Sequence, residues 1–151
     1  MLPTLSRTER ERFLAGVHVG VLGVTDDRAT GAAPLLVPVW YVYEPGGEVI
    51  WQTARDSVKA RLVRGAGRVS LCVQDERAPY RYVSVEGPVV GERDPADAAA
   101  RAAAARRYLP AQDAAAYLEA TRAQLTDDVT FRMRPERWRT ADFSSFAATF
   151  G

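Results

Sequence analysis

The sequence has almost none of the residue types that build disulfides and zinc sites. Cys72 is the single cysteine and His18 the single histidine in 151 residues. One cysteine cannot form a disulfide within the chain or a cysteine-rich zinc site, and one histidine argues against a histidine-centred metal site or a catalytic triad. We therefore expect no metal site. We interpret Cys72 as a small buried residue and His18, which alternates with valines, as a core histidine.

An excess of charge and long apolar runs are missing as well. Lysines and arginines number 20 and acids 19, and this net charge of +1 argues against nucleic-acid or anionic-membrane binding. No apolar run approaches the roughly 18 residues of a membrane span, and residues 1–13 lack the apolar core of a signal peptide. With 47% apolar and 26% charged residues, we expect a single cytoplasmic domain over residues 1–151.

Lysine is nearly absent too, because every cation except Lys59 is an arginine. Lys59 lies two residues after Ser57, a residue type that favours the N-cap of a helix. A cation is unfavourable there, since the helix dipole already makes the N-terminus positive. Arg55 and Arg61 add to this charge, and the segment 53–61 contains a single acid. The pattern predicts that an anion is bound here.

This segment could form a phosphate cradle. Free backbone N–H groups at a helix N-terminus bind anions, and the hydroxyls of Thr53 and Ser57 together with the nearby cations would complete the site. The glycine spacing of a P-loop is absent. The alternative is a solvated loop with an ordinary serine cap and surface arginines, and the local pattern leaves both interpretations open.

Alternating hydrophobicity and turn residues predict short strands joined mostly by hairpins. Pro38 removes a backbone donor from its strand, which indicates an edge, a bulge or a ligand-facing segment. We expect Asp94 to cap a helix whose first residue is Pro95, and the longest strand to break at residues 87–88. The strands do not alternate with helices as in parallel folds, so a mainly β (α+β) antiparallel barrel of six or seven strands with peripheral helices fits best. The predicted strands are 17–25, 35–43, 49–53, 68–74, 80–92, 129–135 and 137–143, and the predicted helices are 6–15, 58–64, 95–109 and 111–125.

Aromatic residues gather in two of these strands, which a tight turn joins into a hairpin. They could form a wall for a flat ring, although the sequence favours core and dimer-interface positions for most of them. Tyr80, Arg81 and Tyr82 open the longest strand, where a cation between two phenols could face an anionic ligand or simply begin a strand. The aromatic residues of the hairpin are Trp40, Tyr41, Tyr43 and Trp51.

The order of these segments resembles a known family. Residues 34–90 are similar to the pyridoxamine 5′-phosphate oxidase-like split β-barrel flavoproteins, and within them to the actinobacterial branch that uses the deazaflavin coenzyme F-420. The resemblance covers about residues 5 to 143. The motifs that carry it are Pro38-Val39-Trp40, Thr53 followed by Ser57-x-Lys59, the RVSL segment at 68–71, and Tyr80 followed by Val83-x-Val85-Glu86-Gly87.

The resemblance implies a homodimer with two cofactor sites at the subunit interface. The strand that contains Pro38, Val39 and Trp40 would run along the tricyclic ring and contact it largely through its backbone. Tyr80 and Arg81 would lie near the pocket and could reach the cofactor of the partner subunit. The phosphate contacts would come from Thr53, Ser57, Val58 and Lys59, with Arg55 and Arg61 as further candidates.

The resemblance also implies the chemistry. True pyridoxamine-phosphate oxidases carry an arginine and a lysine on the strand that here spans residues 37–43, which contain no cation. This departure counts against vitamin-oxidase activity and tight FMN binding, and it favours the deazaflavin with its longer phosphodiester tail. The implied enzyme transfers a hydride between coenzyme F-420 and a small conjugated organic substrate. It needs no protein nucleophile, and Tyr80 and Tyr82 are candidate proton donors.

Three alternatives stay open on the sequence. The first is an FMN-dependent oxidoreductase of the pyridoxamine 5′-phosphate oxidase type. The second is a non-catalytic protein that binds a flavin or a tetrapyrrole. The third is an interaction domain with no affinity for either cofactor, and no residue pattern identifies the substrate.

Overall fold

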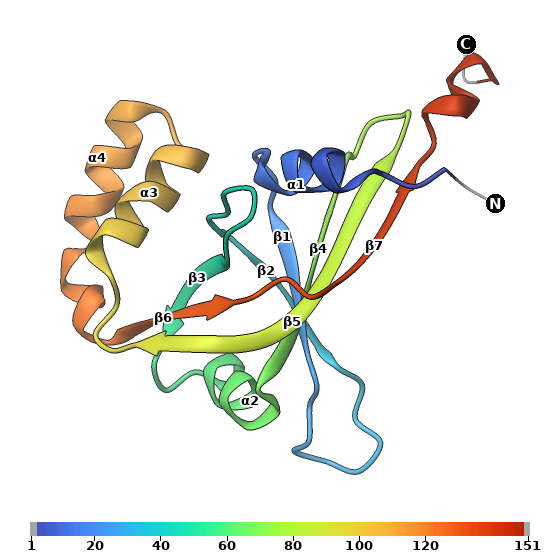
Figure 1. The fold of residues 1–151 in the computed structure, drawn as a ribbon. Coiled ribbons are helices and arrows are strands. Elements are labelled where there is room, and N and C mark those ends of the chain that lie inside the picture. Colours follow the sequence, from blue (N-terminus) through green and yellow to red (C-terminus); the bar gives the residue numbers. More distant parts are fainter. Residues whose placement is uncertain (1–2, 150–151) are drawn as a thin grey trace.

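The chain forms a curled antiparallel sheet that closes part of the way into a barrel, with helices around it (Figure 1). The structure is a computed structural model, and it describes residues 3–149. The strands follow the order β2-β1-β4-β5-β6-β3, and β7 pairs with β5 as a branch. This confirms the predicted α+β split barrel, with seven strands in the described range. Within that range no helix is long and apolar enough to cross a membrane.

The predicted elements are present, most of them with shifted ends. The strands are β1 (Gly20–Val24), β2 (Leu35–Val39), β3 (Val49–Ala54), β4 (Arg68–Gln74), β5 (Arg81–Arg93), β6 (Asp128–Met133) and β7 (Arg137–Asp142). The helices are α1 (Arg7–Ala15), α2 (Val58–Ala66), α3 (Ala98–Tyr108) and α4 (Ala111–Ala120), with short 3-10 turns η1 (Arg122–Thr126) and η2 (Ser144–Thr149).

The long strand β5 connects the two halves of the barrel. It pairs with β4 and β7 along its first part and with β6 along its last part, and Figure 1 shows it crossing the whole sheet. The predicted break at residues 87–88 is wrong, because the strand continues through this point while it passes from one half to the other. The crossing is close: a Cβ on Gly87 would lie 1.8 Å from the carbonyl oxygen of Arg134. Only glycine fits there without movement of the backbone.

Local capping signals position the first two helices. Ser6 and Glu9 form the predicted capping box at the start of α1, with N–O distances of 3.2 and 2.8 Å. Ser57 caps α2 by accepting a hydrogen bond from the Ala60 amide at 3.0 Å. The helix ends at Gly67, which has a φ of 70°, and so runs two residues beyond the predicted end.

The expected start of α3 is wrong. Asp97, not Asp94, is the N-cap, and its carboxylate accepts hydrogen bonds from the amides of Ala99 (2.9 Å) and Ala100 (3.4 Å). Asp94 forms an ion pair with Arg55, a residue 39 positions away, and so does not cap the helix. The predicted helix 111–125 ends as an α-helix at residue 120, and its remainder is η1.

Three of the four aromatic residues of the hairpin lie in the core. Tyr41, Tyr43 and Trp51 are buried, as the sequence favours. The Tyr41 hydroxyl donates to the Leu14 carbonyl at 2.6 Å, and the Trp51 ring stacks on Phe131 with centroids 5.6 Å apart. The core therefore joins α1, the hairpin segment and β6 inside the curled sheet.

His18 and Cys72 are not core residues, contrary to the prediction. Both are half-buried, and both line a concavity on the outer face of β1 and β4. His18 is nonetheless satisfied, because its ring stacks on Phe13 at 4.6 Å and its Nε2 hydrogen-bonds to the Phe13 carbonyl at 3.0 Å. Cys72 pairs with Val21 and Ser84 across the strands, and burial raises the pKa of its thiol.

The helical hairpin of α3 and α4 packs beside β3 and β6 (Figure 1). Polar anchors at the end of α3 fix it to the barrel. The Tyr108 hydroxyl donates to the His18 carbonyl at 2.6 Å and accepts from the Tyr41 amide at 3.2 Å. Arg107 donates to the Gly16 carbonyl. These contacts place one face of α3 opposite the edge of the sheet.

The crossing at Gly87 gives a stability prediction. Gly87→Ala should lower the free energy of unfolding by about 1–3 kcal/mol or more, because the added methyl meets a backbone oxygen. Gly65→Ala is the matched control: it lies in α2 with open space around it, so it should be neutral or stabilise by up to about 1 kcal/mol. Urea unfolding of both variants would measure this, and a Gly87→Ala variant as stable as the parent would contradict the crossing geometry.

Candidate functional site

The barrel is open along a seam between β2 and β3, which are edge strands of opposite halves. A single bridge joins them, with Val42 and Ile50 exchanging hydrogen bonds of 2.9 and 3.0 Å. The same register would next pair Trp40 with Gln52, but no backbone hydrogen bond joins these residues. The predicted hairpin therefore forms only at its closed end, and beyond the bridge the strands diverge.

Backbone groups of both strands face this seam. Alternate residues of an antiparallel strand direct their N–H and C=O groups to the same side, so Trp40 and Gln52 point theirs into the seam as Val42 and Ile50 do. Pro38 is the next such residue on β2, and it has no N–H to donate. The predicted edge position of Pro38 is confirmed, and the seam offers unpaired backbone donors and acceptors to a ligand.

A cavity of about 250 Å³ lies at the seam. It brings together Pro38, Val39 and Trp40 of the first predicted motif and Lys59 of the second. Small and aromatic residues of the helical hairpin close it on the other side. Its apolar wall is formed by Trp40, Val42, Ile50, Ala100, Ala104 and Tyr117, and its polar end by Gln52, Lys59, Arg101, Gln124 and Asp128.

Lys59 is a half-buried cation without a neutralising acid. No carboxylate of the described residues lies within 4 Å of its ammonium group, and burial lowers the pKa of this amine. It lies in the first turn of α2, where the helix dipole adds positive potential. The electrostatic mismatch expected from the sequence therefore exists in the fold, and an anion would relieve it.

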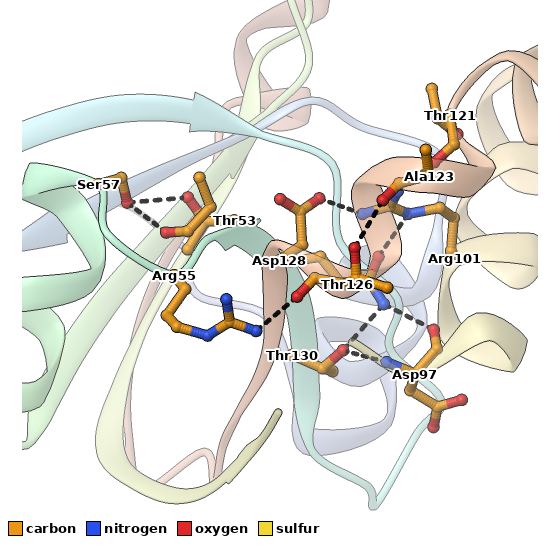
Figure 2. Close-up of polar contacts among 12 residues, drawn as sticks. Thr53, Arg55, Ser57, Asp97, Arg101, Thr121, Ala123, Thr126, Asp128 and Thr130 are labelled. Carbon is orange, nitrogen blue, oxygen red and sulfur yellow. Dashed lines mark hydrogen bonds and ion pairs between the residues drawn. The ribbon is translucent and has the colours of Figure 1, made fainter. Parts of the chain in front are cut away.

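Thr53 and Ser57 lie side by side next to this turn (Figure 2). Their hydroxyl oxygens are 3.3 Å apart, and Ser57 also donates to the Ala54 carbonyl at 2.8 Å. The amide of Ala60 is capped by Ser57, whereas the amides of Val58 and Lys59 have no hydrogen-bond acceptor in the described part of the chain. Two backbone donors thus accompany the Lys59 ammonium group.

The two flanking arginines of the segment do not join this cluster. The guanidinium of Arg55 binds the Asp94 carboxylate, with one contact of 2.7 Å, and donates to the Thr126 carbonyl at 2.6 Å (Figure 2). Arg61 is exposed and does not line the cavity. In this chain, Lys59 is the cation of the segment that faces the cavity.

The residues that open β5 also lie outside the cavity. Tyr80 is exposed, and Arg81 binds the Asp75 carboxylate at 3.0 Å and covers the Phe13 ring at 5.0 Å. Tyr82 pairs with Gln74 across the strands, on the outer face of the sheet. Their proposed place at a cofactor would therefore require a second subunit.

A buried polar network at the end of the cavity was not predicted. Arg101, whose exposed fraction is 6%, donates to the Gln52 side-chain oxygen at 2.9 Å and the Thr121 carbonyl at 3.2 Å, and it pairs with the Asp128 carboxylate. Gln52 in turn donates to Thr130 at 2.9 Å. Figure 2 shows Asp128 between Arg101 and the Thr53–Ser57 pair. The only sign of this network in the sequence was a single arginine, Arg101, within the alanine-rich segment of the predicted helix.

Aromatic side chains form part of the cavity wall. The Trp40 ring stacks on Tyr108, with centroids 5.0 Å apart and planes 9° apart, and contacts Tyr117 at 5.4 Å. Trp40 is only half-buried, so one side of this stack borders the cavity. A flat ring could extend this stack, in which Trp40 is the one residue of the aromatic hairpin and the other rings come from α3 and α4.

A second, larger concavity of about 860 Å³ lies on the outer face of the sheet. Its walls include Val17, Val19, Val21 and Leu36, which are exposed apolar residues. It is an open sheet face, and its one cation, Arg77, lies at the start of a loop next to Glu76. We place the ligand site in the smaller cavity, because the unneutralised cation and the unpaired strand edges are there.

Comparison with known proteins identifies the family. Residues 6–140 match the family model described as pyridoxamine 5′-phosphate oxidase. The chain belongs to this family. The resemblance seen in the sequence is thereby confirmed, and at this level the protein is one of a family of flavin-binding, oxidoreductase-like proteins. No curated protein matches the sequence.

Solved structures of the pyridoxamine 5′-phosphate oxidase fold resemble the chain at low identity. One described as an F-420 reductase is 21% identical, with a TM-score of 0.61 over 85% of this chain and 94% of that one. A conserved hypothetical protein of Mycobacterium tuberculosis is 21% identical, with a TM-score of 0.65 over 92% and 86%. An FAD-binding protein of Mesorhizobium loti is 20% identical, with a TM-score of 0.61 over 93% and 96%. At these identities the likeness shows the fold.

The lowered pKa of Lys59 gives a pH-dependent stability prediction. Without ligand, Lys59→Met should unfold at higher urea than the parent near pH 7, because a desolvated charge is removed. The unfolded lysine, with an ordinary pKa of 10.5, binds protons more tightly than the folded one, so the parent gains stability as pH rises toward that value. The stability difference between Lys59→Met and the parent should therefore narrow as the pH rises toward 10.5.

Arg61→Met on the exposed face of α2 is the control for this comparison. Because arginine in general is effectively always protonated, the stability of this variant relative to the parent should stay constant with pH. If the stability of Lys59→Met relative to the parent is equally constant with pH, this would contradict the conclusion that Lys59 is desolvated in the fold.

Proposed function

We propose that the protein is an oxidoreductase that uses the deazaflavin coenzyme F-420 and transfers a hydride between this cofactor and a small conjugated organic substrate. The observation that carries the proposal is the unneutralised Lys59 in a cavity that also has an aromatic wall and unpaired strand edges. A ligand with a phosphate and a flat ring matches these features.

The phosphate would bind at the start of α2. The Lys59 ammonium and the two free amides of Val58 and Lys59 would supply the donors. The hydroxyls of Thr53 and Ser57, which are hydrogen-bonded to each other and to the Ala54 carbonyl, would have to reorient to join them. Arg55 and Arg61 remain further candidates, although Arg55 would first have to leave Asp94. Burial makes such a site effective, since charge–charge attraction increases away from bulk water.

The ring would lie along the seam. The backbone of Pro38, Val39 and Trp40 offers acceptors and the Trp40 donor, and Gln52 presents its own N–H and C=O from the facing strand. When bound, the cofactor supplies the hydride chemistry, and the residues of this chain hold the ring, orient it and exclude water. Tyr80 and Tyr82 stay candidates for a proton donor from the partner subunit.

The two related alternatives differ in the ligand or in turnover. An FMN-dependent oxidoreductase would need to neutralise a phosphate of higher charge, but residues 37–43 contain no cation and Arg55 is committed to Asp94. A non-catalytic flavin or tetrapyrrole carrier would bind the same cavity. Reduced deazaflavin bound without reduction of any quinone, enone or biliverdin-like acceptor would favour that carrier.

We further propose that the active form is a homodimer whose partner covers the outer sheet face. Leu36 is 67% exposed and Val21 42% exposed in the isolated chain. Leu36 and Pro38 lie on the same side of β2, so the apolar face runs directly into the seam. A second copy on this face would complete the cavity and bring its own Tyr80, Arg81 and Tyr82 near the ring.

Cofactor titration of the purified protein tests the proposed site. The parent protein should bind coenzyme F-420 more tightly than FMN. The fluorescence of each cofactor reports its binding. Lys59→Ala should weaken F-420 binding by about 1.5–3 kcal/mol, the scale of a hydrogen bond to a charged group, which is about tenfold or more in affinity. Arg55→Ala should change affinity far less, because its guanidinium is bound to Asp94. Unchanged affinity of Lys59→Ala would refute the phosphate assignment.

Light scattering after size-exclusion chromatography tests the dimer. Parent protein should have twice the chain mass, and Leu36→Asp should shift it to the monomer because a carboxylate would be buried on the apolar face. Gln112→Asp, on the exposed side of α4, is the control and should leave the mass unchanged. A monomeric parent protein would exclude the proposed interface.

A further inference from the structure

The cavity has a defined and small positive charge. Its charged lining residues are one lysine, one arginine and one aspartate: Lys59, Arg101 and Asp128. Their formal sum at neutral pH is +1. The other arginine of the segment, Arg55, is neutralised by Asp94 and faces away. The charge of a phosphate group that this cavity accepts should therefore be low.

Asp128 is the residue that sets this value. Its partner in the β3–β6 pairing is Ala54, on the sheet face that also carries Gln52, and it lines the same cavity as Lys59. One carboxylate oxygen binds Arg101, and the other accepts no hydrogen bond from the described residues. Figure 2 shows the carboxylate between Arg101 and the Thr53–Ser57 pair. A bound phosphate would have a negative neighbour here.

Arg101 cannot offset that neighbour by turning to the ligand. Its three nitrogens are committed to Gln52, Asp128 and the Thr121 carbonyl, and it is almost completely buried. Gln52 is held in turn by Thr130 and by the Asp97 carbonyl at 2.7 Å. The network is therefore a fixed set of partners in which the free oxygen of Asp128 stays directed at the cavity.

Phosphate esters differ in charge in a way that this arrangement can distinguish. A monoester carries about −1.5 to −2 at pH 7, because its second pKa is near 6. A phosphodiester has no second ionisation and carries −1. The +1 cavity matches the diester, whereas the second charge of a monoester would face the Asp128 carboxylate without a cation to balance it.

We propose that Asp128, held by Arg101, is a specificity residue that makes the cavity select a singly charged phosphodiester group over a doubly charged phosphomonoester group at Lys59. This inference rests on the proposed function, since it requires a phosphate at Lys59. The inference adds the charge of the bound phosphate group, which the proposed contacts at Lys59 alone do not define.

The test uses three ligands with the same ring. Riboflavin has no phosphate, and FMN is a phosphomonoester. The methyl ester of FMN is a phosphodiester and carries one negative charge less than FMN. Binding to the purified protein, whether dimer or monomer, is measured from the quenching of flavin fluorescence. The parent protein should bind the methyl ester more tightly than FMN, and riboflavin more weakly than the methyl ester.

Two variants raise the charge of the cavity by one. Asp128→Asn keeps an oxygen for Arg101 and removes the carboxylate charge, and Gln124→Lys adds a cation at the cavity without touching the network. Each should lower the ratio of the FMN dissociation constant to that of the methyl ester by about fivefold or more, with riboflavin unchanged. Asp113→Asn, on exposed α4, is the control and should leave the ratio unchanged.

The outcomes separate the two proposals. In one outcome both esters bind tightly, and neither Asp128→Asn nor Gln124→Lys changes the ratio of their dissociation constants. This result would overturn the charge selection but would leave the proposed phosphate site intact. A parent protein that prefers FMN would also overturn it. If no ring compound binds, the proposed function fails and this inference fails with it. Gln124→Lys decides the question even where loss of the buried ion pair prevents Asp128→Asn from folding.

Discussion

The single bridge between β2 and β3 is the constraint on which the rest of the site depends. A closed barrel would pair Trp40 with Gln52 and continue toward Ala54, but Pro38 has no N–H for the ladder and the strands separate after Val42 and Ile50. Unpaired edges are a liability in water, where they can pair with other chains. Here the α3–α4 hairpin packs beside one edge, and the opening that remains is the cavity.

Two cations at this opening illustrate opposite solutions to buried charge. Arg101 is satisfied on every nitrogen by groups from three different elements, so it stabilises the attachment of α3 to the sheet. Lys59 has no carboxylate within 4 Å in the described chain, and its burial carries a desolvation cost. The first charge is structural, and the second is available to a ligand.

Features that depend on neighbouring residues were predictable from the sequence, and features that depend on distant residues were not. The capping box at Ser6, the cap at Ser57 and the bounds of β4 follow from local pattern. Asp94 and Asp97 are equivalent caps until Arg55, 39 residues away, engages the first. The place of Lys59 in the first turn of a helix capped by Ser57 was foreseeable for the same local reason, whereas the Arg101 network required α3, β3 and β6 to meet.

The apolar part of the wall that α3 presents to the cavity consists of two alanine methyl groups, from Ala100 and Ala104, beside Arg101. Residues four apart share a helix face, and α3 is fixed by Tyr108, Arg107 and Arg101, none of which depends on those methyls. The width of the cavity is therefore set by positions that the fold does not need for its stability. Relatives built on the same barrel can widen or narrow the range of molecules they accept by exchanging two small side chains, while the barrel itself stays unchanged.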